Sequence, residues 1–214
     1  MDNRQLIARR VARYFKSGDV VNLGIGIPSL CGDYAEDGVF FQAENGYIGV
    51  GSIAEDIMIN ERLVNAGGVP FVPVVGASAF DVAVSFGIIR SGRMTATVLG
   101  ALQVSEKGDL SNWASPNRAF GMGGAMDLVN GSRKVIVAME HCTKKGEPKI
   151  IKKCTFPLTG KSCVDHIVTE LCVIDVTPEG LILRELAPGH TIDEVKLKTE
   201  AHLIIADDFK EMDI

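Results

Sequence analysis

The sequence is poor in aromatic residues, with one tryptophan and three tyrosines among its 214 residues. It lacks a basic segment leading into an apolar run near Met1, so we expect no secretory signal and a cytoplasmic location. Its five cysteines include no Cys-x-x-Cys pair, which favours reduced thiols that fill space over a disulfide framework. A zinc site built from Cys142, Cys154, Cys163 and a histidine would have no standard spacing. No metal is therefore expected.

The sequence also lacks an excess of positive charge. Its 22 basic and 27 acidic residues give a net charge of −5, which disfavours a dedicated nucleic-acid-binding protein. Between Ala66 and Ile89 the only charged residue is Asp81, but glycines and prolines interrupt the first half, so we expect no membrane span. This stretch instead predicts a buried strand over 69–75 and a helix over 78–89.

Helical and extended patterns alternate along the chain. The first predicted helix has an apolar stripe that includes Ile7 and Val11, with Arg9, Arg10 and Arg13 on the other side. We also predict a helix over 29–35 and a short one that begins at Thr191, and strands over 20–23, 40–43, 94–99, 134–139, 167–176, 181–186 and 202–206. This mixture, with no linker or repeat, predicts one open layered α/β domain over residues 1–214 with a largely parallel sheet.

Glycine is abundant, with 23 residues, and three segments around glycines could carry chemistry. Gly24 and Gly26 lie between a predicted strand and a predicted helix, either to form a tight turn or to present amides to an anion. Three glycines within 121–124 precede another helix, and could form a plain turn or stabilise an oxyanion. Glu44 ends a predicted strand, where open α/β folds bind ligands, although a surface glutamate at a turn is also common.

Two phosphate-binding motifs are incomplete. Gly160-Lys161-Ser162 resembles the end of a P-loop, but Thr155 replaces the first glycine that the anion nest requires. The segment 24–29 resembles a dinucleotide fingerprint but ends in Ser29, and Pro28 removes an amide from the turn. The lysine-rich segment 144–153 is typical of a solvated loop or of an electrostatic guide for an anionic ligand.

Several motifs together resemble the β subunit of the family I CoA-transferases. They are Asn22-Leu23-Gly24-Ile25-Gly26-Ile27-Pro28, Gln42-Ala43-Glu44-Asn45-Gly46, Leu99-Gly100-Ala101-Leu102-Gln103-Val104, Asn112-Trp113, Gly121-Met122-Gly123-Gly124-Ala125-Met126-Asp127-Leu128, Met139-Glu140-His141-Cys142, Lys153-Cys154-Thr155-Phe156-Pro157-Leu158-Thr159 and Thr169-Glu170. They occur in the family order and span about residues 5–205. The resemblance implies the open α/β fold of this family (NagB/RpiA-like) and a separate α subunit in a hetero-oligomer, α2β2 or α4β4.

The resemblance also implies a mechanism and a set of site residues. Glu44 takes the place of the family nucleophile, which forms a glutamyl-CoA thioester in ping-pong catalysis. Coenzyme A is then a substrate and a transient covalent group, and no tightly bound cofactor is expected. The implied contacts to CoA or to the intermediate are Asn22, Gly24, Gly26, Asn112, Gly123, Gly124 and Ala125.

The sequence departs from the family pattern near the nucleophile, which leaves the substrate open. Ala43 stands where the family has serine, Tyr47 where it has a branched or phenyl side chain, and the segment 115–120 is one residue short. We expect Ala43, Tyr47 and the segment 115–120 to alter the acyl pocket. The implied substrates are acyl-CoA and a short-chain carboxylate or 3-oxoacid such as acetate, butyrate or acetoacetate, or those of a 3-oxoadipate or succinyl-CoA:3-oxoacid enzyme. An acyl-CoA hydrolase on the same scaffold and a non-catalytic effector-binding domain compete with the transferase.

Overall fold

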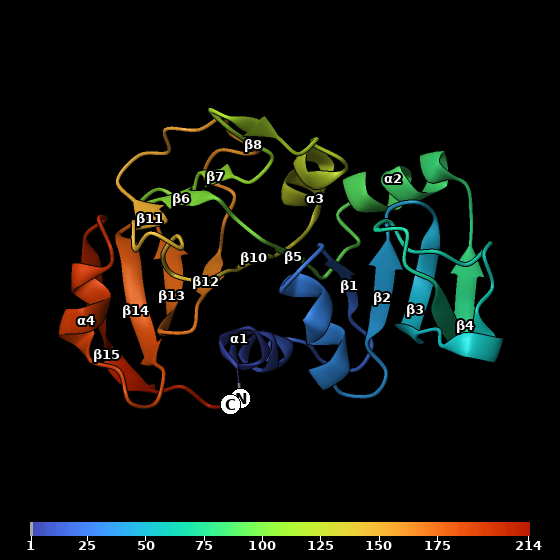
Figure 1. Cartoon of the computed structure of the whole chain (residues 1–214), viewed down its shortest axis with the longest axis horizontal. Coiled ribbons are helices and arrows are strands. Elements are labelled where there is room, and N and C mark those ends of the chain that lie inside the picture. Colours follow the sequence, from blue (N-terminus) through green and yellow to red (C-terminus); the bar gives the residue numbers. More distant parts are fainter. Residues whose placement is uncertain (1) are drawn as a thin grey trace.

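The computed structural model describes residues 2–214, and a ten-stranded sheet runs through it (Figure 1). In sheet order its strands are β15 (Leu203–Glu211), β14 (Gly180–Leu186), β13 (Cys172–Thr177), β12 (His166–Val168), β10 (Val135–Ala138), β5 (Ala96–Leu99), β1 (Val20–Leu23), β2 (Phe40–Ala43), β3 (Tyr47–Ile53) and β4 (Phe71–Ala79). There are two smaller sheets. One contains β11 (Ile150–Ile151), β6 (Gln103–Ser105) and β7 (Leu110–Ser111), and the other pairs β8 (Ala114–Ser115) with β9 (Arg118–Ala119).

The sheet is parallel at its centre. Strands β12, β10, β5, β1 and β2 pair in parallel, whereas β2–β3–β4 on one side and β12–β13–β14 on the other are antiparallel. Parallel neighbours need long crossovers, and the helices that make them cover the sheet. The α/β fold with a largely parallel sheet is therefore confirmed.

The central strands are buried on both faces. Along β10, Val135 and Val137 pack into one apolar core, while Ile136 and Ala138 pack into the other. Because successive side chains of a strand point to opposite faces, a run of small and branched apolar residues contributes side chains to both cores. This explains why these strands are continuous apolar segments in the sequence.

Helices lie on both sides of the sheet. The helices are α1 (Asn3–Ala12), α2 (Val82–Arg90), α3 (Ala125–Gly131) and α4 (Ile192–Leu197), with 3-10 segments η1 (Pro28–Tyr34) and η2 (Asp56–Met58). Helix α1 begins with a capping box between Asp2 and Gln5 and packs Ile7 and Val11 against the sheet. Figure 1 shows α2 and α3 together at the opposite end of the molecule from the two termini.

Five predicted features differ in the structure. The strand predicted as buried, β4, is an edge strand with most of its residues exposed, and the helix after it begins only at Val82, because Asp81 caps it. The segment 167–176 divides at a turn into β12 and β13, and 29–35 forms a 3-10 helix rather than an α-helix. The helical pattern places Arg10 away from the apolar stripe, yet the residue is buried, because its guanidinium pairs with Glu185.

Within residues 2–214, no helix has both the length and the apolar character required to cross a membrane.

Candidate active site

Three polar side chains share one face of the sheet where β1 and β2 end. Asn22 and Gln42 are register partners on these parallel strands, and both are buried. Glu44 follows Gln42 by two residues, in the turn after β2, and its carboxylate lies against Asn22. The predicted position of Glu44 at the carboxyl edge of the sheet is confirmed, because it directly follows β2.

The carboxylate of Glu44 accepts a hydrogen bond from the strand beside it. Asn22 Nδ2 lies 3.2 Å from Glu44 Oε2, 2.7 Å from Gln42 Oε1 and 3.1 Å from the Gln42 carbonyl oxygen. Asn22 is 1% exposed and Glu44 is half-buried. An amide donor aimed at a partly exposed carboxylate holds that carboxylate in place while leaving one side of it open.

The turn after Glu44 requires glycine at its second position. Gly46 has a φ of 126°, and a Cβ atom there would collide with the carbonyl oxygen of Phe80. The Gly46 amide donates to Ala43, and its carbonyl accepts from Phe80, which precedes α2. The turn that carries Glu44 is thus fixed by its own backbone against the segment leading into α2.

Two residues that the sequence did not single out reach this site from α2. Gln42 Nε2 donates to Ser85 Oγ at 2.9 Å, and Ser85 is completely buried. The ring of Phe86 packs beside Gly124. A single serine within the apolar helix 82–89 is the signal that could have pointed to Ser85.

The glycine-rich segment approaches Glu44 closely. A Cβ atom on Gly124 would lie 3.4 Å from Glu44 Cγ and 3.2 Å from the Phe86 ring. Gly124 is buried and begins α3, whereas Gly123 is exposed with a φ of 50°. The Ala125 amide already donates to the Met122 carbonyl at 3.2 Å. Of the three predicted contacts here, Gly124 is the one that the structure brings against Glu44.

Gly24 and Gly26 have different surroundings. The Gly24 amide donates to the Val98 carbonyl at 2.8 Å and so continues the sheet, and a Cβ atom there would lie 3.1 Å from the same oxygen. Gly24 therefore serves close packing of the backbone, and its amide is not available to an anion. Gly26 has a φ of 94°, and its carbonyl accepts from Ser29 in the turn that starts η1.

Asn112 lies in a separate group of contacts. Its side-chain oxygen accepts a hydrogen bond from Thr159 Oγ1 at 2.6 Å, and its backbone N–H donates to the same hydroxyl at 3.2 Å. Asn112 is half-buried, and its hydrogen bonds join β7 to the segment around 159 rather than to Glu44.

Ala43 and Tyr47 face each other across the turn, as register partners of β2 and β3. Ala43 is buried. The Tyr47 hydroxyl donates to the Arg62 carbonyl at 2.8 Å, and the ring packs edge-on against Phe71. Asn45 Nδ2 likewise donates to the Val64 carbonyl at 2.8 Å, so two residues beside Glu44 hold the segment 62–64.

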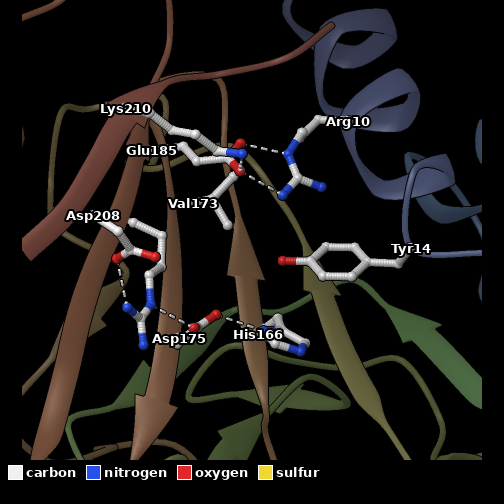
Figure 2. A pocket seen from close by; sticks show the side chains of 9 residues that line it. Arg10, Tyr14, His166, Val173, Asp175, Glu185, Asp208 and Lys210 are labelled. Atoms are coloured by element: carbon white, nitrogen blue, oxygen red, sulfur yellow. Dashed lines mark hydrogen bonds and ion pairs between the residues drawn. The ribbon is translucent and has the colours of Figure 1, made fainter. Parts of the chain in front are cut away.

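A second polar region lies between α1 and the strands β12 to β15 (Figure 2). It is an open groove of about 350 Å³, in which Arg10 makes a two-point ion pair with Glu185, and Asp175 bonds both His166 and Arg184. Its charged groups neutralise one another within the fold, so the groove is a network that ties α1 to the sheet.

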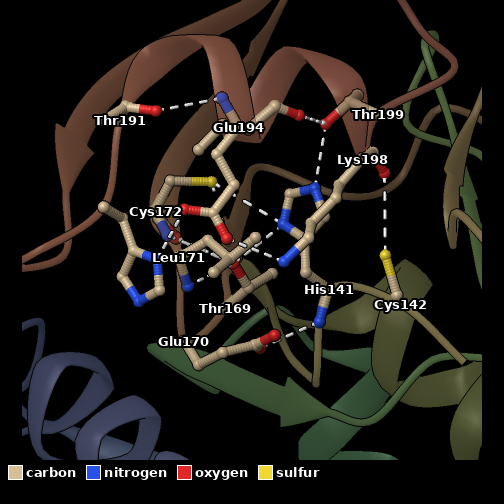
Figure 3. A network of polar contacts seen from close by, with 12 residues as sticks. His141, Cys142, Thr169, Glu170, Leu171, Cys172, Thr191, Glu194, Lys198 and Thr199 are labelled. Carbon is tan, nitrogen blue, oxygen red and sulfur yellow. Dashed lines mark hydrogen bonds and ion pairs between the residues drawn. The ribbon is translucent and has the colours of Figure 1, made fainter. Parts of the chain in front are cut away.

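A third polar network surrounds His141 (Figure 3). The buried ring contacts Thr169 Oγ1 at 3.0 Å and Thr199 Oγ1 at 2.9 Å, and its backbone amide donates to Glu170. Burial, with smaller contributions from Lys198 and Lys149, lowers the pKa of His141 to about 4. The neutral ring therefore joins the β12–β13 turn to the end of α4, consistent with a packing role.

The cysteines are free thiols, as expected. Burial raises the pKa of Cys31 and Cys172 to about 12 and that of Cys163 to about 11, so these groups stay protonated near neutral pH. Among residues 2–214, no group of three or more histidine, cysteine or acidic side chains is arranged to hold a metal ion.

Comparison with known proteins identifies the family of this chain. The sequence pattern of the Coenzyme A transferase family matches residues 4–198. The chain is 48% identical to the acetate CoA-transferase subunit beta of Haemophilus influenzae, over all of this chain and 97% of that protein. It is 45% identical to mitochondrial succinyl-CoA:3-ketoacid coenzyme A transferase 2A of Rattus norvegicus, covering 98% of this chain and 41% of the rat protein.

A solved structure shares the fold. The acyl-CoA transferase YdiF of Escherichia coli O157:H7 superposes with a TM-score of 0.82 at 21% identity, covering 99% of this chain and 43% of that one. Since the family pattern covers nearly the whole chain, this protein belongs to the coenzyme A transferase family. It is therefore an enzyme of CoA transfer, and the effector-binding hypothesis is set aside.

Proposed function

We propose that this chain is the nucleophile-bearing β subunit of an enzyme that moves CoA between short-chain carboxylic acids through a thioester on Glu44. The observation that carries the proposal is the placement of Glu44 at the end of β2, with its carboxylate bonded to Asn22 and its side chain against Gly124. A carboxylate in a fixed position suits this reaction, because exchange of one thioester for another is nearly isoenergetic and needs no activated base.

The first half of the reaction leaves CoA on the protein. A Glu44 oxygen attacks the thioester carbonyl and expels the CoA thiolate, which gives a mixed anhydride. The thiolate then attacks Glu44 Cδ, so the acyl group departs as a free carboxylate that carries one oxygen from Glu44. In the second half an acceptor carboxylate attacks Cδ, the thiolate departs and then attacks the acceptor carbonyl, and Glu44 retains one acceptor oxygen.

Both halves pass through oxyanions, for which the site offers donors close to Glu44. Asn22 Nδ2 already faces the carboxylate, and the backbone at Gly124 is close enough to approach the reacting carbon. A side chain at position 124 would separate the backbone from the nucleophile. This accounts for a buried glycine at the start of α3.

The experiment is to co-express the chain with its α subunit, add acyl-CoA without an acceptor, and reduce with borohydride. The expected result is inactivation together with reduction of Glu44, located by peptide mass spectrometry. Glu44→Gln should give no trapped product, whereas Glu179→Gln, at an exposed turn, should behave as the native chain. An active complex in which Glu44 stays unmodified contradicts the mechanism.

Isotope transfer separates the transferase from a hydrolase on the same scaffold. With an acceptor acid labelled with ¹⁸O in ordinary water, the transferase places one labelled oxygen on Glu44 for each turnover. A hydrolase instead releases CoA without any acceptor and leaves Glu44 unlabelled. Requirement for a second acid is thus the discriminating property.

The partner is an α subunit, as the relatives named "subunit beta" imply. Support comes from apolar side chains exposed at the end of β3 and in the segment after it: Ile57 is 98% exposed, and Ile53, Met58 and Ile59 are at least half exposed. Such a cluster is typical of a protein interface. The complete enzyme must also cover the open side of Glu44, because water would hydrolyse the anhydride and the thioester.

The substrates we propose are acetate, butyrate or acetoacetate and their CoA esters, with succinyl-CoA:3-oxoacid transfer as the second choice. The bacterial relative is named for acetate, and the rat relative is named for succinyl-CoA and a 3-ketoacid. Because the Tyr47 hydroxyl is held by the Arg62 carbonyl, Tyr47 would affect the acyl pocket through its ring and the segment it anchors. A panel of short-chain and 3-oxo acids, assayed with the native chain, Tyr47→Ile and Ala43→Ser, tests this.

A further inference from the structure

We propose that Ser85 is a positioning residue for the nucleophile, acting through Gln42 and Asn22 on the carboxylate of Glu44. The structure shows this chain of contacts as three successive hydrogen bonds: Gln42 Nε2 to Ser85 Oγ at 2.9 Å, Asn22 Nδ2 to Gln42 Oε1 at 2.7 Å, and Asn22 Nδ2 to Glu44 Oε2 at 3.2 Å. This inference rests on the proposed role of Glu44.

The first step concerns how the Asn22 amide is oriented. Its Nδ2 group has two hydrogens and faces three acceptors, of which the Gln42 backbone carbonyl and the Glu44 carboxylate can only accept. Its Oδ1 atom is buried and has no partner among the described residues. The contacts on the Nδ2 side alone therefore decide which way this amide points.

The second step concerns Gln42. Its Oε1 accepts the shortest of the three bonds from Asn22 Nδ2, and this fixes one amide hydrogen so that the other points toward Glu44. Gln42 can hold this position only while its own Nε2 has an acceptor, because the side chain is 3% exposed and an unpaired donor there is unfavourable. Ser85 Oγ is that acceptor.

The third step explains why α2 supplies this contact. Ser85 is completely buried within a helix otherwise built from apolar residues and glycine over 82–89, so its hydroxyl has no solvent partner. The same helix places Phe86 beside Gly124. Helix α2 thus supports the nucleophile from two sides, with a hydrogen bond to Gln42 and an aromatic ring against the glycine segment.

The test measures the first half-reaction in the complex with the α subunit, as the rate of borohydride-trapped thioester on Glu44 at saturating acyl-CoA. Ser85→Ala should slow this rate about tenfold, because the nucleophile loses its fixed orientation. The KM for acyl-CoA should stay within about twofold, because no substrate contact is removed. The control is Ser91→Ala on the C-cap of the same helix, which removes a hydroxyl bonded to Ile88 and should leave the rate unchanged.

A double-mutant cycle separates positioning from a general loss of structure. Gln42→Met removes the amide that Ser85 holds and should also slow thioester formation. In that background, Ser85→Ala should have no further effect, because its path to Glu44 is already broken. A native rate in Ser85→Ala, or an equal loss in both backgrounds, overturns the positioning role. Absence of any thioester on Glu44 in the native complex overturns the proposed function, and this role with it.

Discussion

A Cβ atom on Gly124 would lie 3.4 Å from Cγ of Glu44 and 3.2 Å from the ring of Phe86. The glycine segment and the nucleophile turn belong to parts of the chain that are 80 residues apart in sequence, and a methyl group added between them would touch Glu44 and crowd the ring of Phe86. Close contacts of this kind make function and stability sensitive to single substitutions.

Gly124→Ala should lower the rate of thioester formation by up to about tenfold, because the new methyl group would lie against Glu44 and the Phe86 ring must shift by a few tenths of an ångström to accept it. The matched control is Gly87→Ala on α2, where a Cβ atom would meet no atom within 4 Å. That substitution should leave activity unchanged and stabilise the helix by about 0.5–1 kcal/mol. Thermal unfolding and single-turnover kinetics on both variants provide the measurements, and native kinetics in Gly124→Ala would refute the close approach.

Arg10→Met should reduce the free energy of unfolding by about 3–5 kcal/mol, because it leaves the buried carboxylate of Glu185 without its two-point partner. Arg13→Met, which breaks an exposed pair at 3.7 Å with Asp213, should change it by less than about 1 kcal/mol. Urea unfolding measures both. If the two variants lose equal stability, the burial of the Arg10 pair has no energetic consequence.

His141 should make the protein less stable in acid. Its pKa is about 4 in the folded chain and 6.5 when unperturbed, so below pH 6.5 the unfolded chain binds a proton that the folded chain does not. The free energy of unfolding should therefore fall as the pH drops from about 6.5 to 4, by up to about 3 kcal/mol. In His141→Gln this part of the pH dependence should disappear, as measured by urea unfolding at several pH values. An unchanged slope would show that His141 binds a proton equally well in the folded and the unfolded chain.

Ile57→Asp should weaken assembly with the α subunit, because it places a charge in the exposed apolar segment 53–59. Leu197→Asp is the matched control, since Leu197 is 85% exposed but lies on α4, in the part of the chain that pairs at the other end of the sheet. Co-purification and sedimentation of the two variants give the comparison. Equal assembly of both would place the α subunit elsewhere.

Local patterns were sufficient to predict the central strands and the position of Glu44. Strands β1 and β2 have the predicted bounds, because each is a short apolar run followed by a turn signal. The exposure of β4 was missed, since its valines and phenylalanine are typical of a buried strand whether or not a neighbour covers it.

Long-range pairing explains the remaining differences. Arg10 has the local pattern of a solvated residue because Glu185, its partner, is 175 residues away. Ser85 carries no motif, and its role depends on Gln42, 43 residues earlier. Side chains whose function comes from a distant partner have no local periodicity or spacing that would reveal them.

The parallel pairing at the centre of the sheet also determines when the surroundings of Glu44 can form during synthesis of the chain. Strand β1 pairs in register with β5, which follows β2, β3, β4 and α2 in the chain, and α3 comes later still. Chain segments of this length are slow to bring their ends together during folding, because the conformational entropy of the segment is lost before the strand contacts at its ends stabilise it. A chain emerging from the ribosome therefore carries Glu44 early but completes the surroundings of its carboxylate only after residue 131 has been synthesised. The reactive site therefore forms well after its nucleophile has been synthesised.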